Sequence, residues 1–146
     1  MASTKSIEIL GVNHICLVVK NLTNSKHFFK DIIGMEQHPK VDSWLKIADN
    51  IFLHLVDIPE AMIDNSLFHE IQHFALQVTD LRAVLTRLFE FDLKPFQMDF
   101  SGNVNELTSP KDNLTFGIGT IFVPDPDGNL VEFIQINKGI FAETEN

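Results

Sequence analysis

Tyrosine is absent from the 146 residues, and cysteine occurs once, as Cys16. A single cysteine excludes a disulfide framework within the chain and a zinc site built on several thiolates. Any bound metal is therefore expected to rest on histidine and carboxylate side chains. Long apolar runs are also missing, because residues 15–19 and 51–56 are far shorter than the roughly 20 residues of a membrane span. Residues 1–6 do not resemble a secretory signal, so we expect a soluble, cytoplasmic protein with no membrane partner.

Positive charge is scarce, since 11 Lys and Arg face 20 Asp and Glu, for a net charge of −9. A phosphate-binding surface needs clustered basic residues, so this balance excludes a nucleic-acid partner and favours a small-molecule one. With 45% hydrophobic residues the chain can bury a full core. Its length is typical of one domain, which we expect to cover residues 1–146.

The chain contains a faint internal repeat. Residues 12–22 (VNHICLVVKNL) align with residues 71–81 (IQHFALQVTDL), so that His14 falls on His73. Each copy leads into an amphipathic segment with helical spacing. We expect Thr23 or Asn24 to cap the first helix and Asp80 to cap the second. A repeat of this length predicts a duplicated structural unit.

Short β-rich stretches follow each predicted helix: residues 36–41, 43–47 and 51–56, and then 119–123 and 130–136. The unit thus reads as strand, helix and three strands, in modules of about residues 11–58 and 71–137, which is an α+β arrangement. The last strands also correspond, with residues 50–58 over 128–136, which places His54 opposite Glu132. Proline and glycine in residues 124–129 predict a hairpin turn. Residues 95–118 are polar, long enough to hide a further strand but mostly a loop, and are expected to shape a pocket.

Alternation along strands places His14 and Cys16 on one face of the first strand, His73 on the matching face of its copy, and Glu132 between apolar residues of the last strand. A carboxylate in such a position is costly to bury without a partner, and a metal would supply one. Taken singly, each of these residues fits an ordinary core or edge position. Taken together, His14, His73 and Glu132 predict one divalent metal site with open positions for substrate oxygens.

Other residues fit several roles. His54 fits a fourth ligand, an acid–base residue or a packed histidine equally well. Cys16 could reach the same cavity, although a free cysteine is more often a small buried hydrophobe. Aromatic residues of the chain are expected mainly in the core, with three that could line a pocket: Trp44, Phe96 and Phe100. The remaining histidines show no pairing pattern and are expected at the surface: His27, His38 and His69.

Three segments carry a family resemblance: residues 11–35 (GVNHICLVVKNLTNSKHFFKDIIGM), residues 71–81, and residues 122–135 (FVPDPDGNLVEFIQ). Over residues 12–137 the pattern resembles the vicinal oxygen chelate superfamily, which includes glyoxalases, bleomycin-resistance proteins and extradiol dioxygenases. The resemblance implies two βαβββ modules that form a curled mixed sheet around a metal cavity, with His14, His73 and Glu132 as ligands. It also implies a homodimer, with units often exchanged between the chains. The metal would chelate two adjacent oxygens of a substrate and would be Fe, Mn, Ni or Zn.

Departures from the subfamily patterns leave the reaction open. His54 stands where glyoxalase I carries Glu and methylmalonyl-CoA epimerase carries Gln. Cys16 stands where fosfomycin-resistance proteins carry a catalytic threonine. The tyrosine that extradiol dioxygenases use is missing from this chain. We therefore expect a metal-dependent dioxygenase or lyase/isomerase with His54 as acid or base. The alternative is a metal-free binding or sequestering protein of the bleomycin-resistance type, for which the acidic charge suits a cationic ligand.

Overall fold

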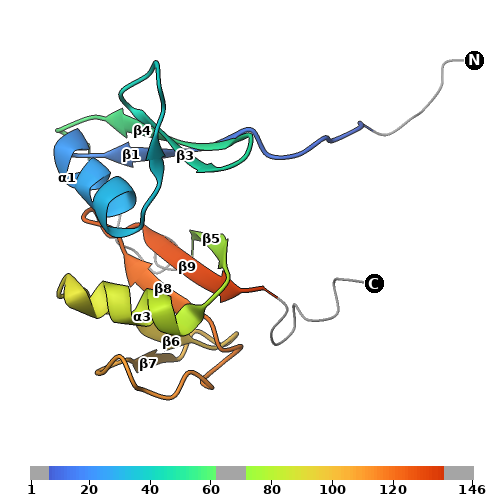
Figure 1. The fold of residues 1–146 in the computed structure, drawn as a ribbon, viewed down its shortest axis with the longest axis vertical. Helices are drawn as coiled ribbons and strands as arrows, with labels where there is room; N and C mark the ends of the chain where they lie inside the picture. Colours follow the sequence, from blue (N-terminus) through green and yellow to red (C-terminus); the bar gives the residue numbers. More distant parts are fainter. Residues whose placement is uncertain (1–6, 62–71, 137–146) are drawn as a thin grey trace, which may run out of the picture.

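Two units with a common topology make up the part of the chain that the structure describes (Figure 1). A computed structural model describes residues 7–61 and 72–136. The first unit runs through β1 (His14–Val19), α1 (Leu22–Lys26), η1 (His27–Ile32), β2 (Glu36–Gln37), β3 (Trp44–Ala48) and β4 (Ile51–Asp57). The second runs through β5 (His73–Val78), α3 (Leu81–Glu90), β6 (Phe96–Met98), β7 (Val104–Glu106), β8 (Ile121–Pro124) and β9 (Leu130–Gln135).

Each unit forms its own mixed sheet, with strand orders β1-β4-β3-β2 and β5-β9-β8-β6-β7. The first strand of each unit lies parallel to the last, and the remaining pairs are antiparallel. The α+β glyoxalase-like fold expected from the sequence is therefore confirmed. The sheets are not closed into one, however, because β1 and β5 each pair along one edge only among the described strands.

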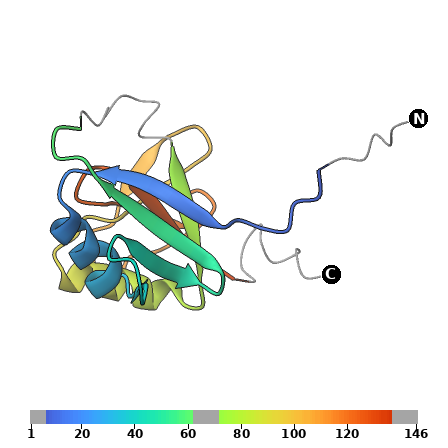
Figure 2. The ribbon, with the colours of Figure 1, turned by 90° about the horizontal axis from the view of Figure 1, so that it is seen from above.

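The helices α1, η1 and α3 lie side by side on one side of the molecule (Figures 1 and 2). They cover the sheet faces that carry alternate apolar residues such as Leu53, Leu55 and Val131, all of which are almost fully buried. A single hydrophobic cluster joins residues of both units, with Phe29 of η1 6.3 Å from Phe74 of β5 between ring centroids. Burying this apolar surface is the main force that holds the two units together.

Arg87 of α3 makes a polar link between the units. Its Nε donates to the carbonyl of Ile32 at 3.1 Å, and one terminal nitrogen donates to the carbonyl of Asp31 at 3.0 Å. These carbonyls lie at the C-terminal end of η1, where helix carbonyls lack partners within the helix. The guanidinium therefore satisfies polar groups of one unit from the other.

The first helix differs from expectation at its N-terminal end and in its helix type. Its cap is Asn21, whose side chain accepts a hydrogen bond from the backbone N–H of Asn24, so the caps expected at Thr23 or Asn24 were wrong. The following turn is a π-helix, with the N–H of Ile33 bonded to the carbonyl of Phe28. Asp80 caps α3 as expected. The first helical stretch thus begins two or three residues earlier than expected, because the side chain of Asn21 accepts the hydrogen bond from the N–H of the third helical residue.

The strand boundaries agree with the sequence to within a few residues. The strand expected at residues 36–41 is only two residues long in the structure, where it is β2. Residues 95–118 hold two short strands, β6 and β7, where a loop with room for a further strand was expected. The predicted hairpin turn forms between β8 and β9, with the N–H of Asp125 bonded to the carbonyl of Asn129 and Gly128 at φ 88°.

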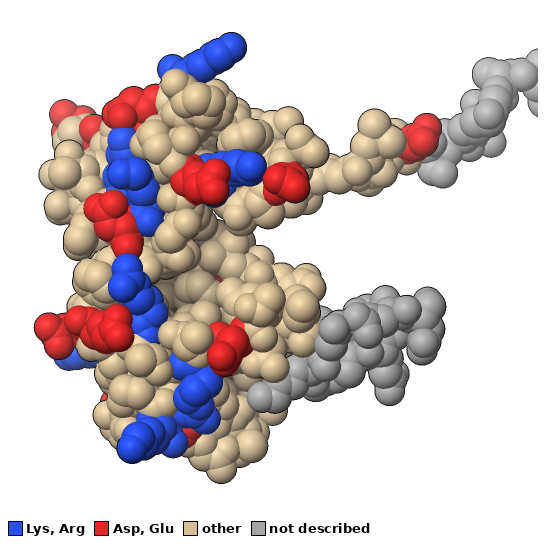
Figure 3. All heavy atoms as spheres, viewed as in Figure 1, with Lys and Arg blue, Asp and Glu red and all other residues tan. Residues whose placement is uncertain are grey.

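Charged side chains of both signs gather on the helix-bearing side of the molecule, and a cleft separates the two units on the opposite side (Figure 3). Within residues 7–61 and 72–136, no helix is long and apolar enough to cross a membrane.

Candidate metal centre

His14 and His54 lie together on one face of the first sheet. The strand register aligns His14 with Phe52 and Cys16 with His54, so these side chains alternate away from the buried core face. The two imidazole rings are 6.0 Å apart between centroids. Nδ1 of His14 is 2.8 Å from the side-chain oxygen of Asn13. Because an amide oxygen only accepts hydrogen bonds, a proton on Nδ1 would satisfy this contact and, in the neutral ring, leave the lone pair of Nε2 for a metal.

His73 and Glu132 lie together on the second sheet. Nε2 of His73 is 3.5 Å from Oε1 of Glu132, whose residue is only 6% exposed. The other carboxylate oxygen, Oε2, accepts a hydrogen bond of 2.8 Å from the hydroxyl of Thr120, which is 3% exposed. A buried carboxylate is thereby held with one oxygen bonded to the protein and the other turned toward an imidazole.

The two pairs occupy equivalent positions of the repeat. Cys16, His54 and Trp44 form one row across the first sheet, and Ala75, Glu132 and Phe122 form the matching row across the second. The correspondence of His54 with Glu132 that the sequence indicates is thus present in the strand register.

The structure does not bring the predicted ligands together in one chain. His14 lies with His54, and His73 lies with Glu132, on separate sheets. Within residues 7–61 and 72–136, no three metal-ligating side chains form a group that could hold an ion. The donor types nevertheless suit a divalent first-row metal, because imidazole and carboxylate bind such ions readily. Each sheet carries half of a suitable set.

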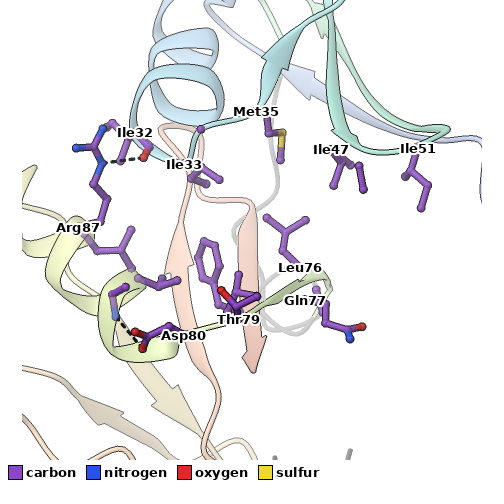
Figure 4. Close-up of a pocket in the computed structure, with 18 of the residues that line it drawn as sticks. Ile32, Ile33, Met35, Ile47, Ile51, Leu76, Gln77, Thr79, Asp80 and Arg87 are labelled. Carbon is purple, nitrogen blue, oxygen red and sulfur yellow. Dashed lines mark hydrogen bonds between the residues drawn. The ribbon is translucent and has the colours of Figure 1, made fainter. Parts of the chain in front are cut away.

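A cleft of about 880 Å³ lies between the two units. Its walls are mainly apolar side chains of both units, including Ile33, Met35 and Ile47 from the first and Leu76 from the second, with Arg87 at one end (Figure 4). None of His14, His54, His73 and Glu132 lines it. The cleft is therefore a feature distinct from the two polar pairs.

Other residues singled out in the sequence have mixed outcomes. Cys16 is exposed, so its reading as a buried hydrophobe was wrong, because β1 is an edge strand whose outer face is uncovered. His27 is exposed, as expected, and bonds to Asp31. His38 is partly buried and its Nδ1 accepts two backbone N–H bonds, so it is not a simple surface residue. Phe100 is 83% exposed. His69 lies outside the described residues.

Two residues make contacts with the polar pairs that were not foreseen from the sequence. Thr120 was not singled out, because its bond to Glu132 depends on the register of two strands, which no local pattern reveals. Trp44 was considered only as a pocket residue. Its place beside both imidazoles follows from its alignment with His54 across β3 and β4.

The sequence matches the family model of the Glyoxalase/Bleomycin resistance protein/Dioxygenase superfamily over residues 11–133. The chain therefore belongs to this superfamily. A search of curated proteins found no match.

Several solved structures share this fold. Oxidase ChaP-H2 is 20% identical with a TM-score of 0.64, over 88% of this chain and 94% of that one. A glyoxalase family protein from Bacillus anthracis is 18% identical with a TM-score of 0.63, over 90% and 98%. The trypanothione-dependent glyoxalase I of Leishmania major is 19% identical with a TM-score of 0.58, over 86% of each chain. At these identities the likeness concerns the fold alone.

Proposed function

We propose that the protein is a cytoplasmic, metal-dependent enzyme that acts on a small substrate with two adjacent oxygens, in a dioxygenase or lyase/isomerase reaction. His14, His73 and Glu132 are the proposed ligands of one divalent ion, Fe, Mn, Ni or Zn. The ion supplies a Lewis acid that polarises chelated oxygens and stabilises negative charge on them. The observation that carries the proposal is the buried Glu132 carboxylate, with Oε1 turned toward His73 and Oε2 held by Thr120.

The surroundings of the ligands support this assignment. Metal-binding histidines commonly bond through their second nitrogen to a carbonyl or carboxylate, which fixes the ring and the tautomer. Asn13 makes such a bond to Nδ1 of His14, and Thr120 plays the corresponding part for Glu132. Each hydrogen bond orients its side chain and leaves the other atom, Nε2 of His14 or Oε1 of Glu132, available to a metal.

His54 is the proposed acid–base residue. It lies beside His14 on the same sheet face and occupies the position equivalent to Glu132. An imidazole exchanges protons near neutral pH more readily than any other side chain, so this position suits a group that takes a proton from a substrate hydroxyl. His54 could alternatively supply a fourth ligand to the metal. The spectrum of the bound metal in the His54→Ala variant would separate the ligand role, which changes that spectrum, from the acid–base role.

We further propose that a homodimer completes the site, with His14 and His54 from one chain and His73 and Glu132 from the other. Two observations support an association of this kind. The pairs lie on separate sheets of one chain, and the outer edges of β1 and β5, which carry His14 and His73, are unpaired among the described strands. Unpaired edges readily accept a strand from another chain.

The first test is metal content, measured by elemental analysis on protein purified without an affinity tag. Near-stoichiometric metal is expected in the wild type and in His27→Ala, a control that removes an exposed histidine far from both pairs. Metal should be lost from Glu132→Gln and His73→Ala, with circular dichroism unchanged. Full metal content in either of these variants would refute the ligand assignment.

Mixing variants tests whether two chains share the site. His14→Ala and Glu132→Ala each lack one ligand, so neither alone binds metal. If ligands come from both chains, unfolding and refolding the two together creates mixed dimers with one intact site, and about one site in four recovers metal. No recovery would show that each site is built within one chain.

The metal-free binding protein remains a second candidate, because the apolar cleft between the units could hold a ligand without any of the four polar residues. It predicts that the wild type takes up no metal even after incubation with Fe²⁺, Mn²⁺, Ni²⁺ and Zn²⁺, and that Ile47→Asp, in the cleft wall, abolishes ligand binding while Glu132→Gln does not.

A further inference from the structure

The indole of Trp44 lies directly beside both imidazoles of the first sheet. Its ring centroid is 4.8 Å from that of His14, with an interplanar angle of 40°, and 4.9 Å from that of His54, with an angle of 30°. The imidazoles are 6.0 Å apart, which is much shorter than rings on opposite faces of the indole would require. The two imidazoles therefore do not lie on opposite faces of the indole, and a ligand held by them would lie close to Trp44.

The aromatic surroundings of the histidines are separate from the hydrophobic core. Trp44 and Phe52 are partly exposed and do not belong to the core cluster, which lies on the helix-bearing side of the sheets. Their rings, with His38, form a continuous set of contacts at 5.4–6.2 Å between centroids. Aromatic rings placed on the face of a sheet away from the core are available to a bound molecule.

The second sheet repeats this arrangement. Phe122 aligns with Glu132 across β8 and β9, just as Trp44 aligns with His54. The ring of Phe122 is 5.2 Å from His73 and stacks on Phe96 at 5.7 Å with an interplanar angle of 12°. Both halves of the proposed site thus set an aromatic ring next to the polar pair.

Cations are nearly absent from these faces. Among the described strand residues that share a face with the histidines or Glu132, Lys46 is the single Lys or Arg, and its ammonium lies 3.3 Å from the carboxylate of Asp49. A substrate with carboxylate or phosphate groups would need such charges as partners. A neutral substrate would not.

We infer that the substrate carries its two adjacent oxygens on or next to a neutral aromatic ring, and that Trp44 selects this ring by stacking on it. The inference rests on the proposed function, because the chelated oxygens fix where the ring lies. Stacking of two rings contributes affinity beyond the area it buries, and it tolerates variation around the ring edge. Trp44 is then the residue that determines specificity for aromatic over aliphatic substrates.

The test compares two chelators that differ only in the ring. Benzohydroxamate and acetohydroxamate present the same two adjacent oxygens, one on a phenyl and one on a methyl group. Their dissociation constants are measured by calorimetry on Zn²⁺-loaded protein freed of excess metal. We expect the wild type to prefer benzohydroxamate by about tenfold, Trp44→Phe to keep most of this preference, and Trp44→Leu to lower it to about twofold or threefold. The control Phe91→Leu, which removes a ring at the end of α3, should behave as wild type.

Fluorescence provides a second readout, because Trp44 is the only tryptophan in the chain. Benzohydroxamate should change its emission more strongly than acetohydroxamate at equal saturation. An unchanged preference in Trp44→Leu that still holds stoichiometric zinc would overturn the inference and leave the proposed function standing. Failure of the zinc-loaded wild type to bind either hydroxamate would refute the proposed function itself, and the inference with it.

Discussion

Replacing Thr120 with valine tests the buried bond that holds Glu132. Valine has nearly the shape of threonine but places a methyl group where the hydroxyl donates to Oε2 at 2.8 Å. With Thr120 3% exposed and Glu132 6% exposed, water cannot readily replace the lost donor. A hydrogen bond to a charged group is worth about 1.5–3 kcal/mol. We expect the metal-free protein to lose this amount of unfolding free energy, which corresponds to a fall in Tm of roughly 4–10 °C for a chain of this size.

A double-variant cycle isolates the bond from other effects of the substitution. In Glu132→Leu the carboxylate is gone, and the Thr120 hydroxyl is left buried without its acceptor. Thr120→Val in that background removes the stranded hydroxyl, so it should be neutral or stabilising. Thr120→Ser, which keeps the hydroxyl, should lose only about 1 kcal/mol for the missing methyl group.

The assay is urea denaturation followed by circular dichroism at neutral pH, with metal affinity measured in parallel. Loss of an outer-shell partner commonly lowers metal affinity by about 10- to 100-fold, so Thr120→Val should bind Zn²⁺ that much more weakly, and Thr120→Ser should bind it nearly as wild type. Equal losses of stability for Thr120→Val in the native and Glu132→Leu backgrounds would show that the hydroxyl does not support the carboxylate.

Three further predictions concern the scaffold. Burial raises the pKa of Asp125 above its ordinary value of 3.8, so the stability of the wild type relative to Asp125→Asn should be greatest below that value and decline as the pH rises through the folded pKa, as paired urea titrations would reveal. Gly117 has φ +63° and a Cβ there would lie 2.5 Å from the backbone oxygen of Met98, so Gly117→Ala should cost more than about 2 kcal/mol in the same titration. Arg87→Leu removes two bonds to carbonyls at the end of η1 and should cost about 1–2 kcal/mol, with faster hydrogen exchange in both units. Arg82→Leu, whose bonds stay within the second unit, should speed exchange there only.

The fold could be predicted from the sequence because the two copies of the repeat show the same alternation of apolar residues along their strands. The alignment of His14 with His73 and of His54 with Glu132 predicted both the duplicated topology and the shared faces, and the register of β1, β4, β5 and β9 confirms them. Turn chemistry was equally readable, since glycine and proline act through local dihedral angles. Local sequence patterns were therefore sufficient to predict most of the topology.

The polar surroundings of the candidate site were less accessible. Thr120 reaches Glu132 only through the register of β8 on β9, and Trp44 reaches the imidazoles only through that of β3 on β4. Free cysteines such as Cys16 are usually buried, but the exposure of Cys16 depends on whether another segment covers the edge strand β1. These properties belong to the packing of distant segments, and one sequence contains no local signal for them.

The unpaired outer edges of β1 and β5 have a consequence for handling the protein. Each edge presents a row of backbone N–H and C=O groups that can form hydrogen bonds with a strand of another molecule. An isolated chain is therefore prone to edge-to-edge aggregation. A second copy that paired with these edges would protect them, and the protected fraction would rise with protein concentration. Dilution would then have two linked effects, the release of metal and the exposure of both strand edges, because the strands that need shielding are the ones that carry His14 and His73.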